Sequence, residues 1–275
     1  EIRQEVGDAE LLISPKMLRK EAPNLPELAQ PQVLRHFLHL SQMTLGTDVN
    51  IDIGLGTCTM KYSPKINEYL ARSPKFTELH PLQDTATMQG ILELIYKTGI
   101  FIKEVSGMDA VTFQPGSGSQ AVFTATSIIR AYHESRGEGS LRNEIITTMF
   151  SHPCNAACPA TAGFEVITLM PGENGCPSVE ALREAVSGHT AGIFITNPED
   201  TGIYNENIGE FVRIVHEAGG LCFYDQANAN GVLGKVRARE AGFDMCHFNL
   251  HKTFSAPHGS LGPACGVLPV KKELE

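Results

Sequence analysis

Strand-like and helical segments alternate along residues 109–250, and this alternation constrains the fold more than any other feature of the sequence. Short runs rich in Ile, Val and Phe are separated by amphipathic segments of about 8–15 residues. The strand-like runs cover residues 109–114, 144–150, 165–171, 191–198, 220–225 and 244–250. Strands that alternate with helices in this way form a mainly parallel sheet with helices on both faces. The sequence therefore predicts an α/β fold.

The expected helices fall between these strands and ahead of them. The apolar periodicity predicts helices over residues 31–45, 85–107, 119–134, 178–186 and 209–219. Ser178 is a good N-cap for one of them. Residues 1–30 are mixed and proline-containing, with little periodicity, and are expected to form an arm. We therefore expect an amino-terminal arm with helices over residues 1–75 and one large domain over residues 76–275.

Charge, cysteine use and hydropathy exclude several classes of protein. The formal net charge of −9 disfavours a nucleic-acid surface, which needs clustered Lys and Arg. No apolar run approaches the ~20 residues of a membrane span, and the first residues lack the pattern of a signal peptide. Seven irregularly spaced cysteines favour reduced thiols. We expect a cytoplasmic protein that binds neither nucleic acid nor membrane.

A glycine-containing segment, residues 52–64, invites a second cofactor hypothesis. Gly54 and Gly56 are spaced as in a dinucleotide fingerprint, but Thr59 occupies the place of the third glycine. A fingerprint also needs a strand before it and a helix after it, and neither is evident here. We interpret the segment as a loop and disfavour a nicotinamide site.

Three polar features follow predicted strands, and ligands gather at the carboxyl ends of strands in an open α/β sheet. The first is the sequence from Gly116 to Ser119, GSGS, which lies between a strand and a helix. Glycines allow close approach of the backbone, and the N–H groups and dipole of a helix start attract a phosphate. An ordinary turn capped by Ser119 is the alternative. No lysine follows the glycines, so the segment is not a Walker loop.

Asp225 and Lys252 are the other two features. Asp225 closes the apolar run 220–225, where an ionised carboxylate is unfavourable unless a cation meets it. Lys252 follows the run 244–250. A strand-end ion pair for Asp225 and a solvated position for Lys252 are the ordinary alternatives. Together with a phosphate site, however, the carboxylate and the amine are what pyridoxal phosphate requires: a lysine for its aldehyde, a carboxylate for its ring nitrogen and a cradle for its phosphate.

Longer stretches make the interpretation more specific. The sequence contains LGTCTMKYSPK, HPLQDTATMQGILELIYKTG, SGMDAVTFQPGSGSQ, SHPCNAACPATAGFEV, ITNPEDTGIY, YDQANANG and HFNLHKTFSAPHG, in this order across about residues 40–270. In these it resembles the P-proteins of the glycine cleavage system, the glycine dehydrogenases (decarboxylating), and among them the subunit 2 type. These are fold-type-I pyridoxal-phosphate enzymes related to the aspartate aminotransferases. The resemblance implies that the large domain, residues 76–275, binds pyridoxal phosphate.

The resemblance also implies a role for each site residue. Lys252 would bond to the cofactor, Asp225 would meet the ring nitrogen, and His152 would stack on the ring. Ala227 would pack below the ring, and the phosphate would be held by three residues: Ser117, Gly118 and Ser119. His251 and His258 flank Lys252; we take His251 as the catalytic candidate, although a packing role fits either histidine.

A metal site is the alternative for His152, together with Cys154 and Cys158. No fourth ligand has zinc-like spacing in this sequence. We therefore expect no metal.

The activity implied by the resemblance is decarboxylation of glycine, with transfer of the aminomethyl group to the lipoyl arm of the H-protein. The implied partners are glycine, a companion glycine dehydrogenase subunit 1, the lipoylated H-protein and further copies in a homo- or hetero-oligomer. Another fold-type-I enzyme, such as an aminotransferase, is one alternative. A non-catalytic fragment that binds cofactor or partner is another.

The sequence departs from the family in two places. The segment SLGPACG, residues 260–266, replaces a run of glycines, so Leu261 and Cys265 would narrow the site entrance. The sequence also ends at Glu275, without the small carboxyl-terminal domain of fold-type-I enzymes. We expect a truncated subunit that is incomplete as an enzyme by itself.

Overall fold

The structure is a computed structural model that describes residues 14–44, 46, 48–49, 52–55, 58–258 and 262–275. Contacts divide the chain into two compact units, Glu1–Leu45 and Gly46–Glu275. In the first unit the structure describes a short 3-10 helix, η2 (Pro15–Met17), and α2 (Gln30–Gln42), which confirms the predicted helix near residue 31. The predicted cofactor-binding domain over residues 76–275 stays a prediction. None of the described helices is long and apolar enough to cross a membrane.

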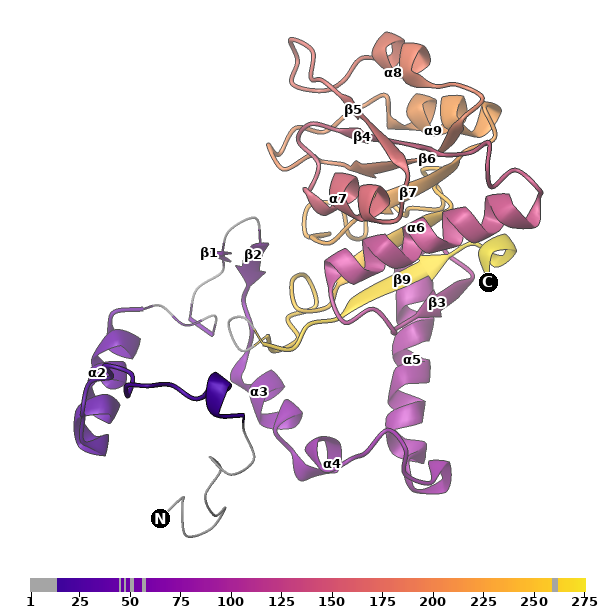
Figure 1. The fold of residues 1–275 in the computed structure, drawn as a ribbon. Helices are drawn as coiled ribbons and strands as arrows, with labels where there is room; N and C mark the ends of the chain where they lie inside the picture. The colour runs from indigo at the N-terminus through magenta and orange to yellow at the C-terminus, as the bar shows by residue number, and fades with distance from the viewer. Residues whose placement is uncertain (1–13, 45, 47, 50–51, 56–57, 259–261) are drawn as a thin grey trace. The chain divides into compact units, whose positions relative to one another are not determined.

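A seven-stranded sheet forms the centre of the second unit (Figure 1), in the order β3-β9-β8-β7-β6-β4-β5. The strands β8, β7, β6, β4 and β5 pair in parallel, whereas β9 is antiparallel to both of its neighbours. The bounds are β3 (Ala110–Thr112), β4 (Glu144–Thr148), β5 (Glu165–Leu169), β6 (Thr190–Thr196), β7 (Leu221–Asp225), β8 (Met245–Asn249) and β9 (Gly266–Val270). The predicted mainly parallel α/β fold is confirmed.

Helices bury both faces of this sheet. Ile145 and Ile146, consecutive on β4, belong to two different buried clusters, because successive side chains of a strand point to opposite faces. One cluster includes residues of α5, α8 and α9, and the other includes residues of α6 (Figure 1). The helix bounds are α3 (Lys65–Ala71), α4 (Pro74–Thr77), η3 (Thr85–Thr87), α5 (Gln89–Ser106), α6 (Gly118–Ser135), α7 (Cys154–Thr161), α8 (Val179–Ala185), α9 (Ile208–Glu217) and η4 (Lys272–Leu274). Ser178 caps α8 as predicted, accepting a hydrogen bond from the N–H of Ala181.

The predicted loop over residues 52–64 is wrong. β1 (Asp52–Leu55) and β2 (Cys58–Lys61) pair as an antiparallel hairpin. A dinucleotide fingerprint depends on a strand, a tight turn and a helix, so the hairpin removes the nicotinamide interpretation. Gly56 lies outside the described residues.

Two unpredicted elements border the candidate site, and each contains a proline. Helix α7 includes Pro159, and strand β9 includes Pro269. Proline has no N–H to donate and is uncommon inside helices and central strands. For this reason the sequence pattern predicted neither the helix nor the strand. Both elements matter for function, because α7 and β9 border the site described below.

Asp244, just before β8, is the centre of a buried polar cluster. Its Oδ1 accepts a hydrogen bond from Lys271 Nζ at 2.7 Å, and its Oδ2 accepts from the N–H of Cys222 and meets His216 Nε2, each at 2.7 Å. Burial opposes ionisation of this carboxyl, but the hydrogen bonds from His216 and Lys271 outweigh it and lower the pKa of Asp244. His216, Cys222 and Asp244 also have a metal-like spacing. The Lys271 ammonium already satisfies the carboxylate, so we interpret the cluster as structural.

Asp244→Asn is expected to lower the free energy of unfolding by about 2–3 kcal/mol at pH 7, because it leaves the ammonium of Lys271 without its counterion. The pKa of Asp244 is lower in the folded chain than in the unfolded chain. The stability that it provides is therefore present above about pH 4 and is lost as the pH falls through the folded-state pKa. Urea unfolding at several pH values tests this. A difference between wild type and variant that stays constant from pH 7 to pH 3 would contradict it.

Candidate active site

The candidate site lies where the parallel strands end. Asp225 is the last residue of β7 and pairs in register with Thr196, the last residue of β6. On its other side Asp225 pairs with His247 of β8, and β8 ends at Asn249, three positions before Lys252. Parallel pairing thus brings the carboxylate and the lysine to the same edge of the sheet, as the sequence predicted.

Lys252 is buried. The residue is only 3% exposed. Among the described residues, its amine makes no hydrogen bond or ion pair. A tight turn fixes the backbone, because the N–H of Lys252 donates to Asn249 O and the N–H of Ser255 donates to Lys252 O, both at 3.0 Å. Ser255 has a φ of 51°, the left-handed region that non-glycine residues rarely adopt. A buried amine without a partner is unfavourable, so its position requires a functional explanation.

Two cavities meet at Lys252. The larger, about 500 Å³, is lined by His152, Thr196, Pro198, Glu199, Asp200, Gly202, Asp225, Ala227, Asn228, Gly231 and Lys252. The smaller, about 200 Å³, is lined by Ser117, Gly118, Ser119, His152, Cys154, Asp225, Ala227, His247, Asn249, His251, Lys252, His258 and Ala264. Every residue that the sequence predicted for the site therefore lines the smaller cavity. Four of them line both cavities: His152, Asp225, Ala227 and Lys252.

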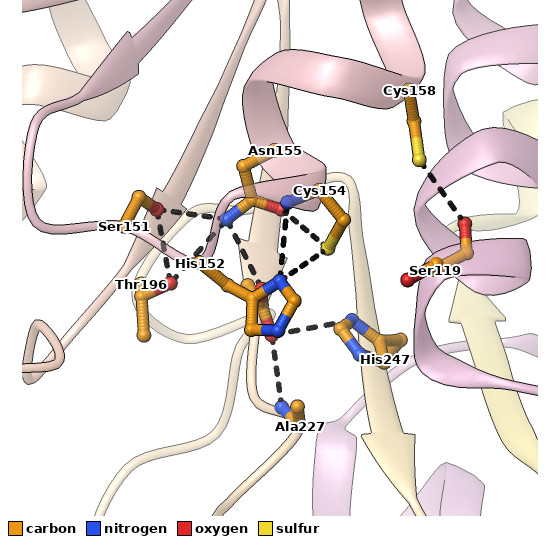
Figure 2. Close-up of polar contacts among 10 residues, drawn as sticks. Ser119, Ser151, His152, Cys154, Asn155, Cys158, Thr196, Ala227 and His247 are labelled. Carbon is orange, nitrogen blue, oxygen red and sulfur yellow. Dashed lines mark hydrogen bonds and ion pairs between the residues drawn. The ribbon is translucent and has the colours of Figure 1, made fainter. Parts of the chain in front are cut away.

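Asp225 is also buried, at 3% exposure, but its carboxylate has donors (Figure 2). Asn155 Nδ2 donates to Oδ2 at 3.1 Å, and the N–H of Ala227 donates to Oδ1 at 3.0 Å. Asn155 is itself held, because its Nδ2 also lies 2.8 Å from Ser151 Oγ and 3.4 Å from Thr196 Oγ1. This network holds the carboxylate at the junction of the two cavities and stabilises its charged form.

His152 follows β4 and borders both cavities. The N–H of Cys154 donates to His152 Nδ1 at 3.1 Å, and the Cys154 thiol lies 2.8 Å from the same nitrogen (Figure 2). A nitrogen that accepts a hydrogen bond carries no proton, so the neutral ring is protonated at Nε2. The loop thus fixes the orientation and the tautomer of His152.

The metal interpretation of His152, Cys154 and Cys158 does not fit the geometry. In the described part of the chain, the metal-like spacing occurs at His216, Cys222 and Asp244 and not at these three residues. Cys158 instead donates to Ser119 O at 3.4 Å. A hydrogen bond between the two thiols raises the pKa of Cys154 and lowers the pKa of Cys158. The thiols therefore contact each other and the start of α6.

The start of α6 offers free N–H groups to the smaller cavity. Ser117 is the N-cap, its Oγ accepting from the N–H of Gln120 at 3.1 Å, so the alternative of a cap at Ser119 is wrong. Among the described residues, neither the N–H of Gly118 nor that of Ser119 has an acceptor. The N–H of Gly116 is already used by Gln120 Oε1, at 2.6 Å. Two free donors and the dipole of an 18-residue helix make an anion site.

Glycines permit the close packing around this anion site. A Cβ on Gly118 would lie 2.7 Å from Asn249 Nδ2, and a Cβ on Gly266 would lie 2.3 Å from Ser117 O. Real Cβ atoms do not approach so closely, so both positions require glycine or a local shift. Glycine at these two positions therefore allows β8 and β9 to lie directly against the start of α6.

His251 and His258 lie beside Lys252, with their ring centroids 4.4 Å apart and their planes tilted by 36°. Burial, together with the neighbouring His258 and Lys252, lowers the pKa of His251 to about 4. The His251 ring is therefore neutral near pH 7. Its Nδ1 accepts from the N–H of Cys265 at 3.4 Å, so the ring proton is on Nε2. His258 Nδ1 donates to Pro263 O at 2.7 Å.

Sequence reasoning missed four site residues: Asn155, Thr196, His247 and Asn249. Thr196 and Asn249 carry a signal that was available, since each is a polar residue near the end of a predicted apolar run and is the last residue of the observed strand. Asn155 lies in the unpredicted helix α7. His247 lies within an apolar strand, and a histidine at such a position is usually interpreted as a packed core residue.

Comparison with known proteins places the chain in a family. The family model of the class-V aminotransferases matches residues 104–275. This range includes all the residues named above as lining the two cavities. The chain belongs to the aminotransferase class-V family. The fold of this family is that of pyridoxal-phosphate enzymes, in agreement with the fold predicted from the sequence.

Curated relatives match the chain over a longer range than the family model does. The chain is 48% identical over 270 residues to a protein of Pyrococcus abyssi named probable glycine dehydrogenase (decarboxylating) subunit 2. It is 46% identical over 268 residues to the protein of the same name in Staphylococcus saprophyticus. These matches cover 98% of this chain and 53% and 54% of the relatives. The chain thus spans about half the length of the curated relatives it matches.

Solved structures share the fold at lower identity. A glycine decarboxylase (P-protein) of the glycine cleavage system, in inhibitor-bound form, matches with a TM-score of 0.72 and 22% identity, over 99% of this chain and 61% of that one. The sphingosine-1-phosphate lyase of Burkholderia pseudomallei matches with a TM-score of 0.68 and 13% identity, over 94% and 62%. At these identities the similarity concerns the fold.

Proposed function

We propose that the chain binds pyridoxal phosphate through Lys252 and belongs to an enzyme that decarboxylates glycine. The observation that supports this most strongly is the position of Lys252, a buried residue at the junction of two cavities, whose amine has no hydrogen-bond or ion-pair partner among the described residues. A lysine amine in such a place is positioned to attack an aldehyde. The names of the relatives from Pyrococcus abyssi and Staphylococcus saprophyticus support the choice of glycine.

The residues present fit this cofactor. The free N–H groups of Gly118 and Ser119 would hold the phosphate, and the Asp225 carboxylate would accept a hydrogen bond from the protonated ring nitrogen. His152 and Ala227 both border the space between, where they would enclose the ring. When bound, pyridoxal phosphate supplies an electron sink for the pair of electrons left by the departing carboxylate. The chain's part is to orient the ring and to keep the Asp225 carboxylate charged.

Two histidines of the chain, His152 and His251, border the reacting centre. His152 would direct its Nε2–H toward the larger cavity. His251 would place a neutral ring beside the Lys252 amine. Neither ring competes with Lys252 for the negative charge of Asp225. We propose His251 as the residue that exchanges a proton with the Lys252 amine, because both line the smaller cavity.

The proposed enzyme is an assembly. The relatives are named subunit 2, which implies a companion subunit 1. We propose this subunit and a lipoylated H-protein, which would take the aminomethyl group, as partners. Helix α5 supports an interface, because it exposes six large apolar side chains: Leu92, Leu94, Ile95, Tyr96, Ile100 and Phe101. We further propose a cytoplasmic location. The six cysteines whose side chains the structure describes are free thiols, as is usual in a reducing compartment.

Gly118→Ala is expected to weaken binding of pyridoxal phosphate about tenfold or more. The added Cβ would meet the Asn249 amide at 2.7 Å and shift the N–H groups that hold the phosphate. Gly90→Ala, in α5, is the matched control, because a Cβ there meets nothing within 4 Å. Titration of cofactor absorbance with both variants measures the effect. Equal affinities for the two variants and wild type would place the phosphate elsewhere.

An isotope-exchange assay tests the proposed reaction. The chain, a companion subunit and H-protein are mixed with pyridoxal phosphate, and exchange of labelled CO₂ into the carboxylate is followed for glycine, alanine, serine and aspartate. Exchange into glycine alone supports the proposal. Amino transfer from aspartate to a keto acid would instead indicate an aminotransferase, and covalent cofactor binding without turnover of any substrate would indicate a non-catalytic subunit.

A further inference from the structure

His247 is a fully buried histidine beside Asp225 that has no assigned role. It is 1% exposed, lies on the interior strand β8 and borders the smaller cavity. Among the described residues, neither of its ring nitrogens has a hydrogen bond. A buried polar group without a hydrogen bond is unfavourable, so a histidine here requires a reason other than packing.

The surroundings fix the orientation of the ring. Phe223, on the adjacent strand, stacks against it with ring centroids 5.5 Å apart and an interplanar angle of 7°. In this orientation Nδ1 lies 3.5 Å from Oδ1 of Asp225. The distance is long for a hydrogen bond, as is common in ligand-free sites that tighten in the complex.

The ring is neutral in this environment. Burial lowers the pKa of His247 most strongly, the carboxylate of Asp225 opposes this effect, and the proximity of Lys252 and His152 adds to it. A neutral imidazole has one N–H. The carboxylate of Asp225 faces Nδ1, so the proton is most stable on that nitrogen.

We propose that His247 is a positioning residue for Asp225: its Nδ1–H is the third donor to the carboxylate, beside Asn155 Nδ2 and the N–H of Ala227. The inference rests on the proposed function in that Asp225 serves the ring nitrogen of pyridoxal phosphate. Three donors hold the carboxylate ionised and aimed at that nitrogen. Because His247 is neutral, it supplies a hydrogen bond without cancelling the negative charge that the pyridinium proton requires.

The first test needs no cofactor. Nitrogen-15 NMR of histidine side chains in the full 275-residue chain distinguishes the two neutral tautomers, with His247→Phe to assign the signal. The expected result is an Nδ1–H tautomer for His247 that shifts toward the tautomer mixture of free imidazole in Asp225→Asn. An Nε2–H tautomer in wild type, or no response to Asp225→Asn, would overturn the pairing. This outcome is independent of whether the chain binds pyridoxal phosphate.

The second test measures affinity for pyridoxal phosphate by equilibrium dialysis. His247→Phe keeps a ring for Phe223 but removes the donor, and is expected to weaken binding about tenfold, the equivalent of one charge-assisted hydrogen bond. His247→Asn places an amide N–H near the position of Nδ1 and is expected to restore most of the affinity. The exposed His189, just before β6 at the opposite end of the strands, provides the control His189→Phe, which is expected to bind like wild type.

A double variant separates positioning from general packing. In the Asp225→Asn background, His247→Phe is expected to cause little further loss, because the carboxylate that it serves is gone. A further tenfold loss in that background would show that His247 acts independently of Asp225 and would overturn the proposal. Equal binding by wild type and His247→Phe would also overturn it. If wild type itself fails to bind pyridoxal phosphate, the proposed function fails, and the tautomer measurement still decides the pairing.

Discussion

Lys252→Met is expected to stabilise the ligand-free chain while it eliminates covalent binding of the cofactor. Lys252 is buried, and its amine has no partner in the part of the chain that the structure describes, whereas methionine fills nearly the same volume without a charged group. Replacing a buried ionisable group by an apolar one of similar size often raises the free energy of unfolding, here by about 1–3 kcal/mol. A residue that lowers stability where it stands is typical of a functional site.

Addition of pyridoxal phosphate is expected to reverse the order of stability. Ligand that binds only the folded state stabilises wild type by about 2.7 kcal/mol at a hundredfold excess over its dissociation constant. The variant lacks the covalent attachment and gains much less. Thermal unfolding of both proteins, with and without cofactor, measures the four values. Lys97→Met, at an exposed position of α5, is the control and is expected to change none of them. A ligand-free Lys252→Met that is less stable than wild type would contradict the burial of an unpaired amine.

Asp225→Asn is expected to lower the rate of glycine decarboxylation by about 10²–10³-fold in the assembled enzyme. A neutral amide does not hold the ring-nitrogen proton of the cofactor as a carboxylate does. The variant also disturbs the network, because two donors, Asn155 Nδ2 and the N–H of Ala227, need two acceptor oxygens. An amide supplies only one, so a loss of about 1–3 kcal/mol in stability is expected as well.

The exchanged pair Asp225→Asn with Asn155→Asp separates the two effects. It restores one amide and one carboxylate in contact with each other, so the stability is expected to return. The negative charge, however, moves to α7, and the rate is expected to stay low. Steady-state exchange of labelled CO₂ and urea unfolding measure the two quantities. A rate that recovers along with the stability would show that the carboxylate at position 225 is structural.

The sheet was predictable from the sequence because its strands are buried on both faces. Runs such as residues 191–198 and 220–225 are apolar without alternation, and amphipathic helices separate them. Lys252 and Asp225 were predictable for a related reason: each polar residue interrupts an apolar pattern at a strand end. The hairpin at residues 52–61 was missed because its sequence has no clear alternation and resembles a glycine-containing loop.

The supporting residues of the site were not predictable from local patterns. Asn155 contacts Asp225, which lies 70 positions later in the sequence. Asn155 belongs to α7, which was not predicted because Pro159 lies within it. His247 lies in register with Asp225, and register between strands follows from the assembled sheet rather than from either strand alone. The close contact of Gly266 with Ser117 O likewise depends on β9, an element that the sequence did not reveal.

Reductive labelling tests the central claim most directly. The chain is incubated with pyridoxal phosphate, the bond between cofactor and protein is reduced with borohydride, and the digested peptides are mapped by mass spectrometry. The structure predicts one major pyridoxyl-labelled peptide, carrying the label on Lys252, and loss of that peptide in Lys252→Met. A major label on another lysine, such as the exposed Lys97, or no label with cofactor in excess, would contradict the assignment of Lys252 as the cofactor-binding residue.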